Sequence, residues 1–143
     1  MKLMMMMMTM VLALSACAGG TDSAEADTPV TYETTATTDG GSFTVSYTTD
    51  PAPIPTDDYF TVTATVAAAG DGALLSGAVV EMDADMPSHG HGMNVSPETT
   101  DGGDGTYSGS PFLFHMTGDW RLRFAVTRDG VTETAEMFAD CCE

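Results

Sequence analysis

The histidines of this chain are confined to two short segments, and methionine stands beside the histidine in both. The sequence has 3 histidines: His89 and His91 flank a glycine, and His115 immediately precedes Met116. Imidazole nitrogen and thioether sulfur together favour copper, because a thioether selects Cu(I) and imidazole binds both oxidation states. If the fold brings the two segments together, we expect one soft-metal site.

Two further methionines enlarge the candidate set. Met93 follows His91 by two residues, and Met86 stands directly before a proline that must end a strand. The glycine between the two neighbouring histidines lets the backbone turn so that both imidazoles can face one ion. Alternation along the later segment turns only one member of its histidine–methionine pair toward that ion. The candidate metal ligands are therefore His89, His91, Met93, His115, Met116 and Met86.

The same residues also support interpretations without a metal. Histidines beside glycine often hold a loop through hydrogen bonds, and a methionine at a strand end often lies at the rim of a core. Met86 fits such a core position as well as it fits a ligand position. The His-Gly-His loop is then only a packing element of a structural or interaction module of the cell envelope. A small apolar ligand between the sheets is a third alternative, and zinc is disfavoured because thioethers are poor zinc ligands.

Composition and motifs argue against two large classes of function. The chain has 21 acidic and 4 basic side chains and a formal net charge of −17, which repels the phosphate backbone of nucleic acids. No serine–histidine–acid arrangement, phosphate-binding loop or cysteine beside a base can be placed in the sequence, so we expect no enzyme. The leading hypothesis is a copper carrier or buffer, whose partner is a protein that donates or accepts copper.

The chain begins with the pattern of an export signal. Lys2 precedes an apolar run that is too short to span a bilayer as a helix. The sequence Leu14-Ser15-Ala16-Cys17 resembles the lipobox of bacterial lipoproteins. That resemblance implies that residues 1–16 are a lipoprotein signal peptide, that Cys17 is acylated and, since Ala18 follows it, that the protein resides at the outer membrane. Lipid on Cys17 would then attach the protein to the membrane of the cell envelope.

The segments on either side of the expected domain carry few apolar residues. Residues 17–41 consist largely of small, polar and acidic side chains, which predict a flexible acidic tether, with order beginning at Ser42. At the other end Cys141 and Cys142 are adjacent. Such a pair can close a vicinal disulfide, bind a soft metal as thiolates or lie in a frayed tail.

Alternation of apolar and polar side chains predicts strands along the rest of the chain. The predicted strands cover residues 43–47, 60–66, 77–85, 112–115, 120–127 and 131–138. Three prolines in Asp50–Pro55 predict an extended crossing between strands. The motif Asp104-Gly-Thr-Tyr107 looks like a tyrosine corner, in which the hydroxyl bonds to the backbone at a strand entry. About seven short strands predict an all-β fold, an immunoglobulin-like antiparallel β-sandwich over residues 42–140.

Taken together, these motifs resemble the YtkA-like and FixH-related domain family. The resemblance is carried by Met86-Pro-x-His89-Gly-His91-Gly, by Asp-Gly-x-Tyr107 and by Phe114-His115-Met116-x-Gly-x-Trp120. It covers roughly residues 51–138 and implies an immunoglobulin-like fold. Through the FixH members it also implies a link to the copper-dependent maturation of terminal oxidases. FixH itself has a transmembrane anchor, in whose place this chain carries the lipobox cysteine.

Overall fold

The computed structural model describes residues 29–142, and within this range the chain forms nine β-strands. Strands β1 to β9 span Thr35–Thr37, Phe43–Asp50, Tyr59–Ala68, Val79–Met86, His91–Gly92, Glu98–Asp101, Thr106–Leu113, Gly118–Arg128 and Val131–Cys141. The predicted signal peptide, Cys17 and the first part of the predicted tether lie outside the described residues. Within those residues, we find no helix that has the length and apolar character needed to cross a membrane.

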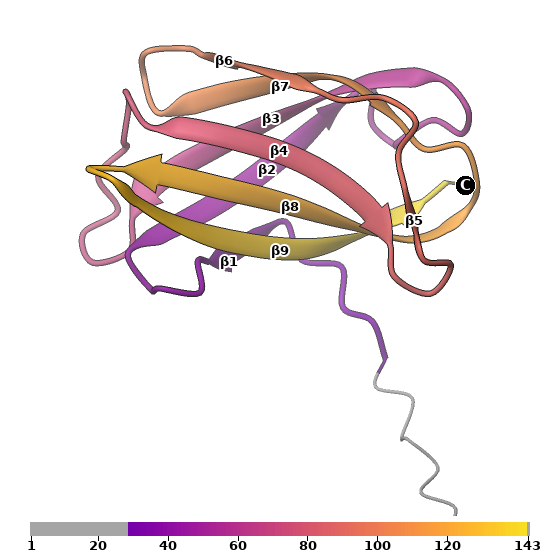
Figure 1. The fold of residues 1–143 in the computed structure, drawn as a ribbon, viewed down its shortest axis with the longest axis horizontal. Helices are drawn as coiled ribbons and strands as arrows, with labels where there is room; N and C mark the ends of the chain where they lie inside the picture. Colours follow the sequence, from indigo (N-terminus) through magenta and orange to yellow (C-terminus); the bar gives the residue numbers. More distant parts are fainter. Residues whose placement is uncertain (1–28, 143) are drawn as a thin grey trace, which may run out of the picture.

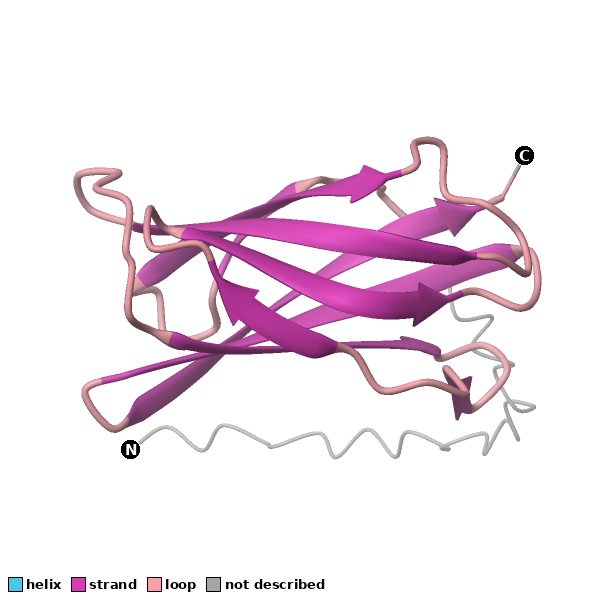
Figure 2. Cartoon of the chain, turned by 90° about the horizontal axis from the view of Figure 1, so that it is seen from above, coloured by secondary structure: helices cyan, strands magenta, loops and turns pink. Residues whose placement is uncertain are grey.

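The strands form two antiparallel sheets that stack as a sandwich (Figures 1 and 2). One sheet has the order β1-β2-β3-β7-β6 and the other the order β5-β4-β8-β9. The predicted all-β, immunoglobulin-like antiparallel sandwich is thus confirmed. The sequence predicts fewer strands than the nine observed because β1, β5 and β6 have only 3, 2 and 4 residues. Such short edge strands show too little alternation to be recognised.

The core lies between the inner faces of the two sheets. In β8 the apolar side chains Trp120, Leu122, Phe124 and Val126 are all 0% exposed, and the arginines between them point outward. This is the period of two that a sheet with one buried face requires. Met82 on β4 is also buried, so its predicted core position is confirmed.

Strand β7 corrects one sequence prediction. The prediction of a separate short strand over residues 112–115 is wrong, because β7 runs without a break from Thr106 to Leu113. Its register with β3 shifts between Phe60 and Val62, where two residues of β7, Ser110 and Pro111, face one residue of β3. This β-bulge accommodates the proline within the strand.

Both ends of the domain extend further than the sequence predicts. β1 pairs with β2 at residues that we assigned to the tether, and Thr38 is 3% exposed, so order begins before Ser42. At the other end β9 pairs with β8 as far as Cys141, which is 1% exposed and joined to Cys142 in a disulfide. The frayed-tail interpretation of the two cysteines is therefore wrong.

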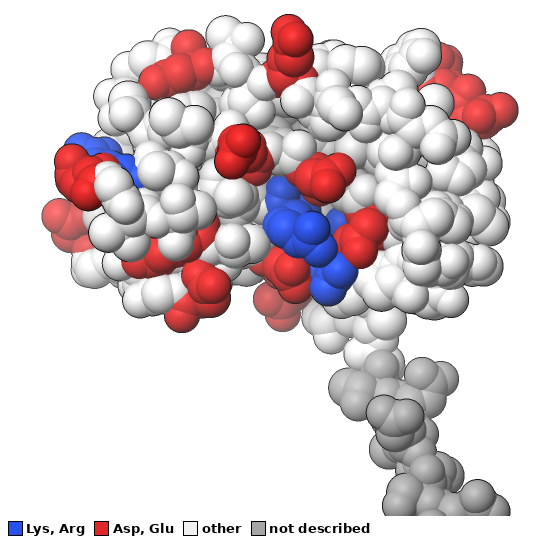
Figure 3. Space-filling model, in the orientation of Figure 1, with Lys and Arg blue, Asp and Glu red and all other residues white. Residues whose placement is uncertain are grey.

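The outer face of the four-stranded sheet carries a group of paired charges, and Figure 3 shows arginines there with acidic side chains around them. Arg121 donates to both carboxylate oxygens of Asp85, from Nε at 2.9 Å and from Nη2 at 2.6 Å. Arg123 lies 3.1 Å from Glu136. These bonds from Arg121, rather than burial, hold the pKa of Asp85 below its usual value.

Candidate metal centre at the histidine–methionine end

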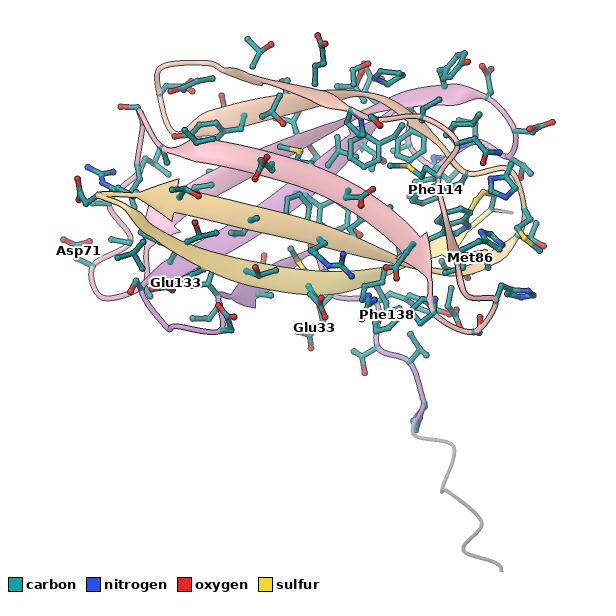
Figure 4. The ribbon with its side chains drawn as sticks, in the orientation of Figure 1. Glu33, Asp71, Met86, Phe114, Glu133 and Phe138 are labelled. Atoms are coloured by element: carbon teal, nitrogen blue, oxygen red, sulfur yellow. A yellow bond between two sulfur atoms is a disulfide. The ribbon has the colours of Figure 1, made fainter. Side chains whose placement is uncertain are left out.

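The two histidine-containing segments meet at one end of the sandwich. The first follows β4, which ends at Met86, and the second joins β7, which ends at Leu113, to β8, which begins at Gly118. Figure 4 shows Met86 and Phe114 at this end, with Asp71 and Glu133 at the opposite end. We call it the His/Met end and define it by His89, His91, Met93, His115 and Met116.

The register of β4 and β5 turns His91 toward the core. His91 stands directly opposite Met86 in this antiparallel pair. Opposite residues of such a pair project from the same face of the sheet, and Met86 is 1% exposed. His91 therefore leans over the end of the core, where its ring centroid lies 5.8 Å from that of Trp120.

A tight turn separates His91 from the other histidine of its motif. The amides of His89 and Gly90 both donate to the carbonyl of Met86, at 3.1 and 2.9 Å. Gly90 has a φ of 68°, a conformation that glycine adopts without the cost of a Cβ. The predicted turn at this glycine is present, but it does not bring both imidazoles to one point. The turn leaves His89 exposed, with its ring centroid 5.9 Å from that of His91.

Two stacked aromatic rings form the base under the second segment. The rings of Phe114 and Trp120 lie 4.2 Å apart and within 4° of parallel, and both side chains are 0% exposed. Trp120 also donates from Nε1 to the carbonyl oxygen of Met116 at 3.0 Å. The indole therefore fixes the backbone of Met116 as well as packing against the core.

The shortest contact between the two segments joins a nitrogen to a sulfur. His91 Nε2 lies 3.2 Å from Met116 Sδ, while His91 Nδ1 lies 3.3 Å from the carbonyl oxygen of Gly92. With the ring proton on Nδ1, the carbonyl of Gly92 accepts it and the lone pair of Nε2 faces the sulfur; with the proton on Nε2, the sulfur accepts it instead. Metal-binding histidines commonly have the first arrangement, with the other ring nitrogen bound to a carbonyl.

His115 completes the cluster. Its ring centroid lies 5.0 Å from that of His91 and 5.4 Å from that of Trp120. Its Nδ1 atom is buried and has no hydrogen-bond partner. Buried polar atoms are nearly always paired, so an unpaired imidazole nitrogen in a ring next to His91 is a candidate cation ligand.

Only some of the six predicted ligands lie close together in the structure. It brings His91, His115 and Met116 together, whereas His89 is exposed on the turn and Met86 belongs to the core. Met93 is half-buried against the core. Both His115 and Met116 approach His91, although alternation predicted only one of them there. Strand alternation does not apply because both residues lie beyond the end of β7.

The chemistry of the donor set narrows the choice of metal. Within residues 29–142, no group of three or more His, Cys, Asp or Glu side chains is placed to hold a metal ion. The cluster reaches three donors only if the sulfur of Met116 is counted with the two imidazoles. Two imidazoles and one thioether fit copper and suit zinc or calcium poorly.

Two features of this end were missed by sequence reasoning. The hydrogen bond from Trp120 to Met116 has no signature in the sequence. The buried position of Cys141 could have been predicted from the sequence. One alternation of buried side chains runs along β9 through Ala135, Met137, Ala139 and Cys141.

Comparison with known proteins adds one result to this geometry. A family model described as YtkA-like matches residues 35–125. That segment contains β1 to β7 and most of β8, together with all the residues of the His/Met end. Neither the curated proteins nor the solved structures include a match.

Proposed function

The chain belongs to the YtkA-like family, and we propose that within this family it is a copper carrier or buffer that binds the ion at its His/Met end. The ligands in this proposal are His91 through Nε2, Met116 through Sδ and His115 through Nδ1. The observation that carries it is the 3.2 Å approach of His91 Nε2 to Met116 Sδ. With the ring proton on Nδ1, the lone pairs of these two atoms gain little from facing each other unless a cation lies between them.

The surroundings of these three atoms favour Cu(I). Cu(I) accepts a small number of soft donors, and a thioether is one of them. The stacked, buried rings of Phe114 and Trp120 give the cluster an apolar base. Hydrophobic surroundings of this kind control solvent access to a metal. Exposed residues Pro87–Gly90 border the other side, through which copper can enter from a donor protein and leave to an acceptor.

The sequence also indicates where in the cell this function would be carried out. A lipid on Cys17 would hold the domain on the membrane of the cell envelope, with the segment before β1 as its tether. The acidic surface would attract cations and repel anionic lipid. In this proposal the protein binds copper and passes it on.

A competition titration tests the proposal. The full-length chain, kept in mild detergent because of its apolar leader, is titrated with Cu(I) against a chromogenic chelator. We expect submicromolar affinity, and a loss of at least about tenfold in each of His91→Ala and Met116→Leu, because each removes a ligand. Met82→Leu, a buried methionine of the same sandwich outside the His/Met end, is the matched control and keeps the wild-type affinity.

The alternative function gives a different result. If the His-Gly-His loop only packs against Trp120, the wild type shows no competitive copper binding. His91→Ala then lowers the melting temperature with or without copper. A domain with those properties is a structural or interaction module of the envelope, and the proposal is wrong.

A further inference from the structure

The two cysteines of the folded domain lie at the same end as the candidate metal centre. Cys141 is the last residue of β9, and it stands opposite Gly118, the first residue of β8. Gly118 is two residues from Met116, whose sulfur contacts His91. Figure 4 shows the sulfur–sulfur bond of Cys141 and Cys142 at the end where Met86 and Phe114 are labelled.

Gly118 lies between the cysteines and the site and carries no side chain, and the terminal methyl of Met86 packs against it. A Cβ on Gly118 would lie 3.0 Å from the terminal methyl of Met86, so this residue faces the inner side of the sheet. Met86 and Cys141 are 1% exposed and approach this position from β4 and β9, the two neighbours of β8. Adjacent strands lie about 4.8 Å apart. Cys141 is therefore one strand away from the segment that carries His115 and Met116.

The two cysteines differ in their access to solvent. Cys141 is buried in the core, whereas Cys142 is half-buried and packs at the edge of the core. A thiol from outside can attack the sulfur of Cys142, while the sulfur of Cys141 remains inside the protein. Thiol–disulfide exchange needs one accessible sulfur, which Cys142 provides.

We propose that the Cys141–Cys142 pair is a two-electron store that reduces Cu(II) to Cu(I) at the His/Met end. The dithiol form loses two S–H bonds and forms one S–S bond, and its two protons pass to solvent. The two electrons go one each to two Cu(II) ions that bind in succession, and both leave as Cu(I). Thiol–disulfide exchange with an external dithiol then returns the pair to its reduced form. This inference rests on the proposed function, since it needs copper held by His91 and Met116.

The redox chemistry of the His/Met end and that of the cysteine pair are complementary. A thioether with imidazoles stabilises Cu(I) more than Cu(II), and a dithiol is a two-electron reductant. A site that prefers Cu(I) but meets Cu(II) in an oxidising compartment needs an electron source close by. The cysteine pair is the one redox-active pair of side chains among residues 29–142.

A single-turnover experiment tests this inference. The full-length chain carries Cys17→Ser, so that Cys141 and Cys142 are its only cysteines. It is reduced with a phosphine, freed of reductant without oxygen and mixed with two equivalents of Cu(II). Loss of the Cu(II) electron paramagnetic resonance signal and loss of free thiols are followed together. We expect two Cu(II) ions and two thiols consumed per chain, and a rate at least about tenfold lower in the His91→Ala/Met116→Leu variant, since positioned reactants react faster.

The controls separate this inference from the proposed function. Met82→Leu should react as the wild type does, and Cys142→Ser should bind Cu(I) normally but consume no more than one Cu(II). Circular dichroism checks that each variant is folded. Equal rates of Cu(II) reduction in the wild type and in the double variant would overturn the inference, even if oxidised protein binds Cu(I) tightly. Failure of oxidised protein to bind Cu(I) would instead overturn the proposed function.

Discussion

At one end of the sandwich the carboxylate of Glu133 and the hydroxyl of Tyr107 are held by hydrogen bonds within the chain, whereas at the other end a ring nitrogen of His115 is buried without a partner. Arg128 Nη1, at the first end, is also buried without a partner. The carboxylate of Glu133 accepts hydrogen bonds from the hydroxyls of Thr38 and Ser42 and from the amide of Ser42 at 3.0 Å. Gly40 lies so close that a Cβ there would overlap the carboxylate. This arrangement joins the β1–β2 turn to β9.

Tyr107 makes a second closed arrangement at the same end. Its hydroxyl donates to the carbonyl of Leu75 at 2.7 Å and accepts from the amide of Ala78 at 3.1 Å. The predicted bond from a tyrosine hydroxyl to the backbone is confirmed. Its partners lie in the β3–β4 connection, about thirty residues upstream, rather than a few residues away as in a tyrosine corner.

The His/Met end differs in this respect. His115 Nδ1 has no partner, and His91 Nε2 and Met116 Sδ are in contact. Under the proposed function, we expect the first end to contribute mainly to stability and the second end to contribute donors to copper. Variants at the two ends should therefore separate stability from copper binding.

The largest effect is expected from Phe114→Ala. Removing a fully buried ring that stacks on Trp120 should lower the free energy of unfolding by about 3–5 kcal/mol. Because this ring forms the base of the His/Met end, copper affinity should fall as well. Phe112→Ala removes an equally buried ring two residues earlier, which packs on Phe60 and does not stack on Trp120, and it should cost similar stability with normal affinity. Chemical denaturation and Cu(I) competition measure the two effects, and equal loss of affinity in both variants would contradict the contrast between the ends.

Tyr107→Phe should lower stability without changing copper affinity. It leaves the Leu75 carbonyl and the Ala78 amide without their partner and should destabilise the domain by about 1–3 kcal/mol. Copper affinity should not change, because this hydroxyl lies at the other end. Tyr59→Phe, at a side chain 61% exposed, is the matched control and should change neither quantity. Urea denaturation checks the prediction, and a Tyr107→Phe protein as stable as wild type would refute it.

The carboxylate of Glu133 should make stability depend on pH. Hydrogen bonds from Ser42 and Thr38 hold the pKa of Glu133 below its usual value of 4.5. A lowered pKa in the folded state adds stability above pH 4.5 and loses it as the pH falls through the folded-state pKa. The melting temperature of Glu133→Gln should therefore lie below that of the wild type at neutral pH, and the difference should shrink below pH 4.5. A difference that stays constant down to pH 3 would show that the charge of Glu133 is not involved.

The smallest effect is expected from Arg121→Lys on the outer face beside Met86. An ammonium cannot reproduce the two bonds from the guanidinium to Asp85, and the loss should be about 0.2–1 kcal/mol because the pair is partly exposed. Arg123→Lys, whose contact with Asp85 is longer, should cost less. Differential scanning calorimetry at low and high salt compares the two variants. An equal cost for both would show that the geometry of the pair has no energetic role.

The sequence predicts the central strands well and the edges poorly. In β8 the buried and exposed side chains alternate over almost the whole strand, so the period of two is plain from Trp120 to Val126. β5 has two residues and is fixed only by its pairing with Asp85 and Met86. No local pattern encodes such a pairing. For the same reason the start of the domain at Thr35, which depends on pairing with β2, is not visible in the sequence.

For the candidate site, residue types were predictable and orientation was not. The His-Gly-His and His-Met motifs pointed to the two segments that the fold brings together. Which members would meet depends on the register that turns His91 inward and on the bond from Trp120 that fixes Met116. Both are properties of the tertiary structure, so the predicted set also contained His89 and Met86.

X-ray absorption at the copper edge of the Cu(I)-loaded full-length chain tests the central claim most directly. We expect a site with imidazole nitrogen and one sulfur scatterer, and we expect the sulfur to disappear in Met116→Leu while remaining in Met82→Leu. A spectrum with only nitrogen and oxygen scatterers, or one that Met116→Leu leaves unchanged, would contradict a copper site built from His91, His115 and Met116.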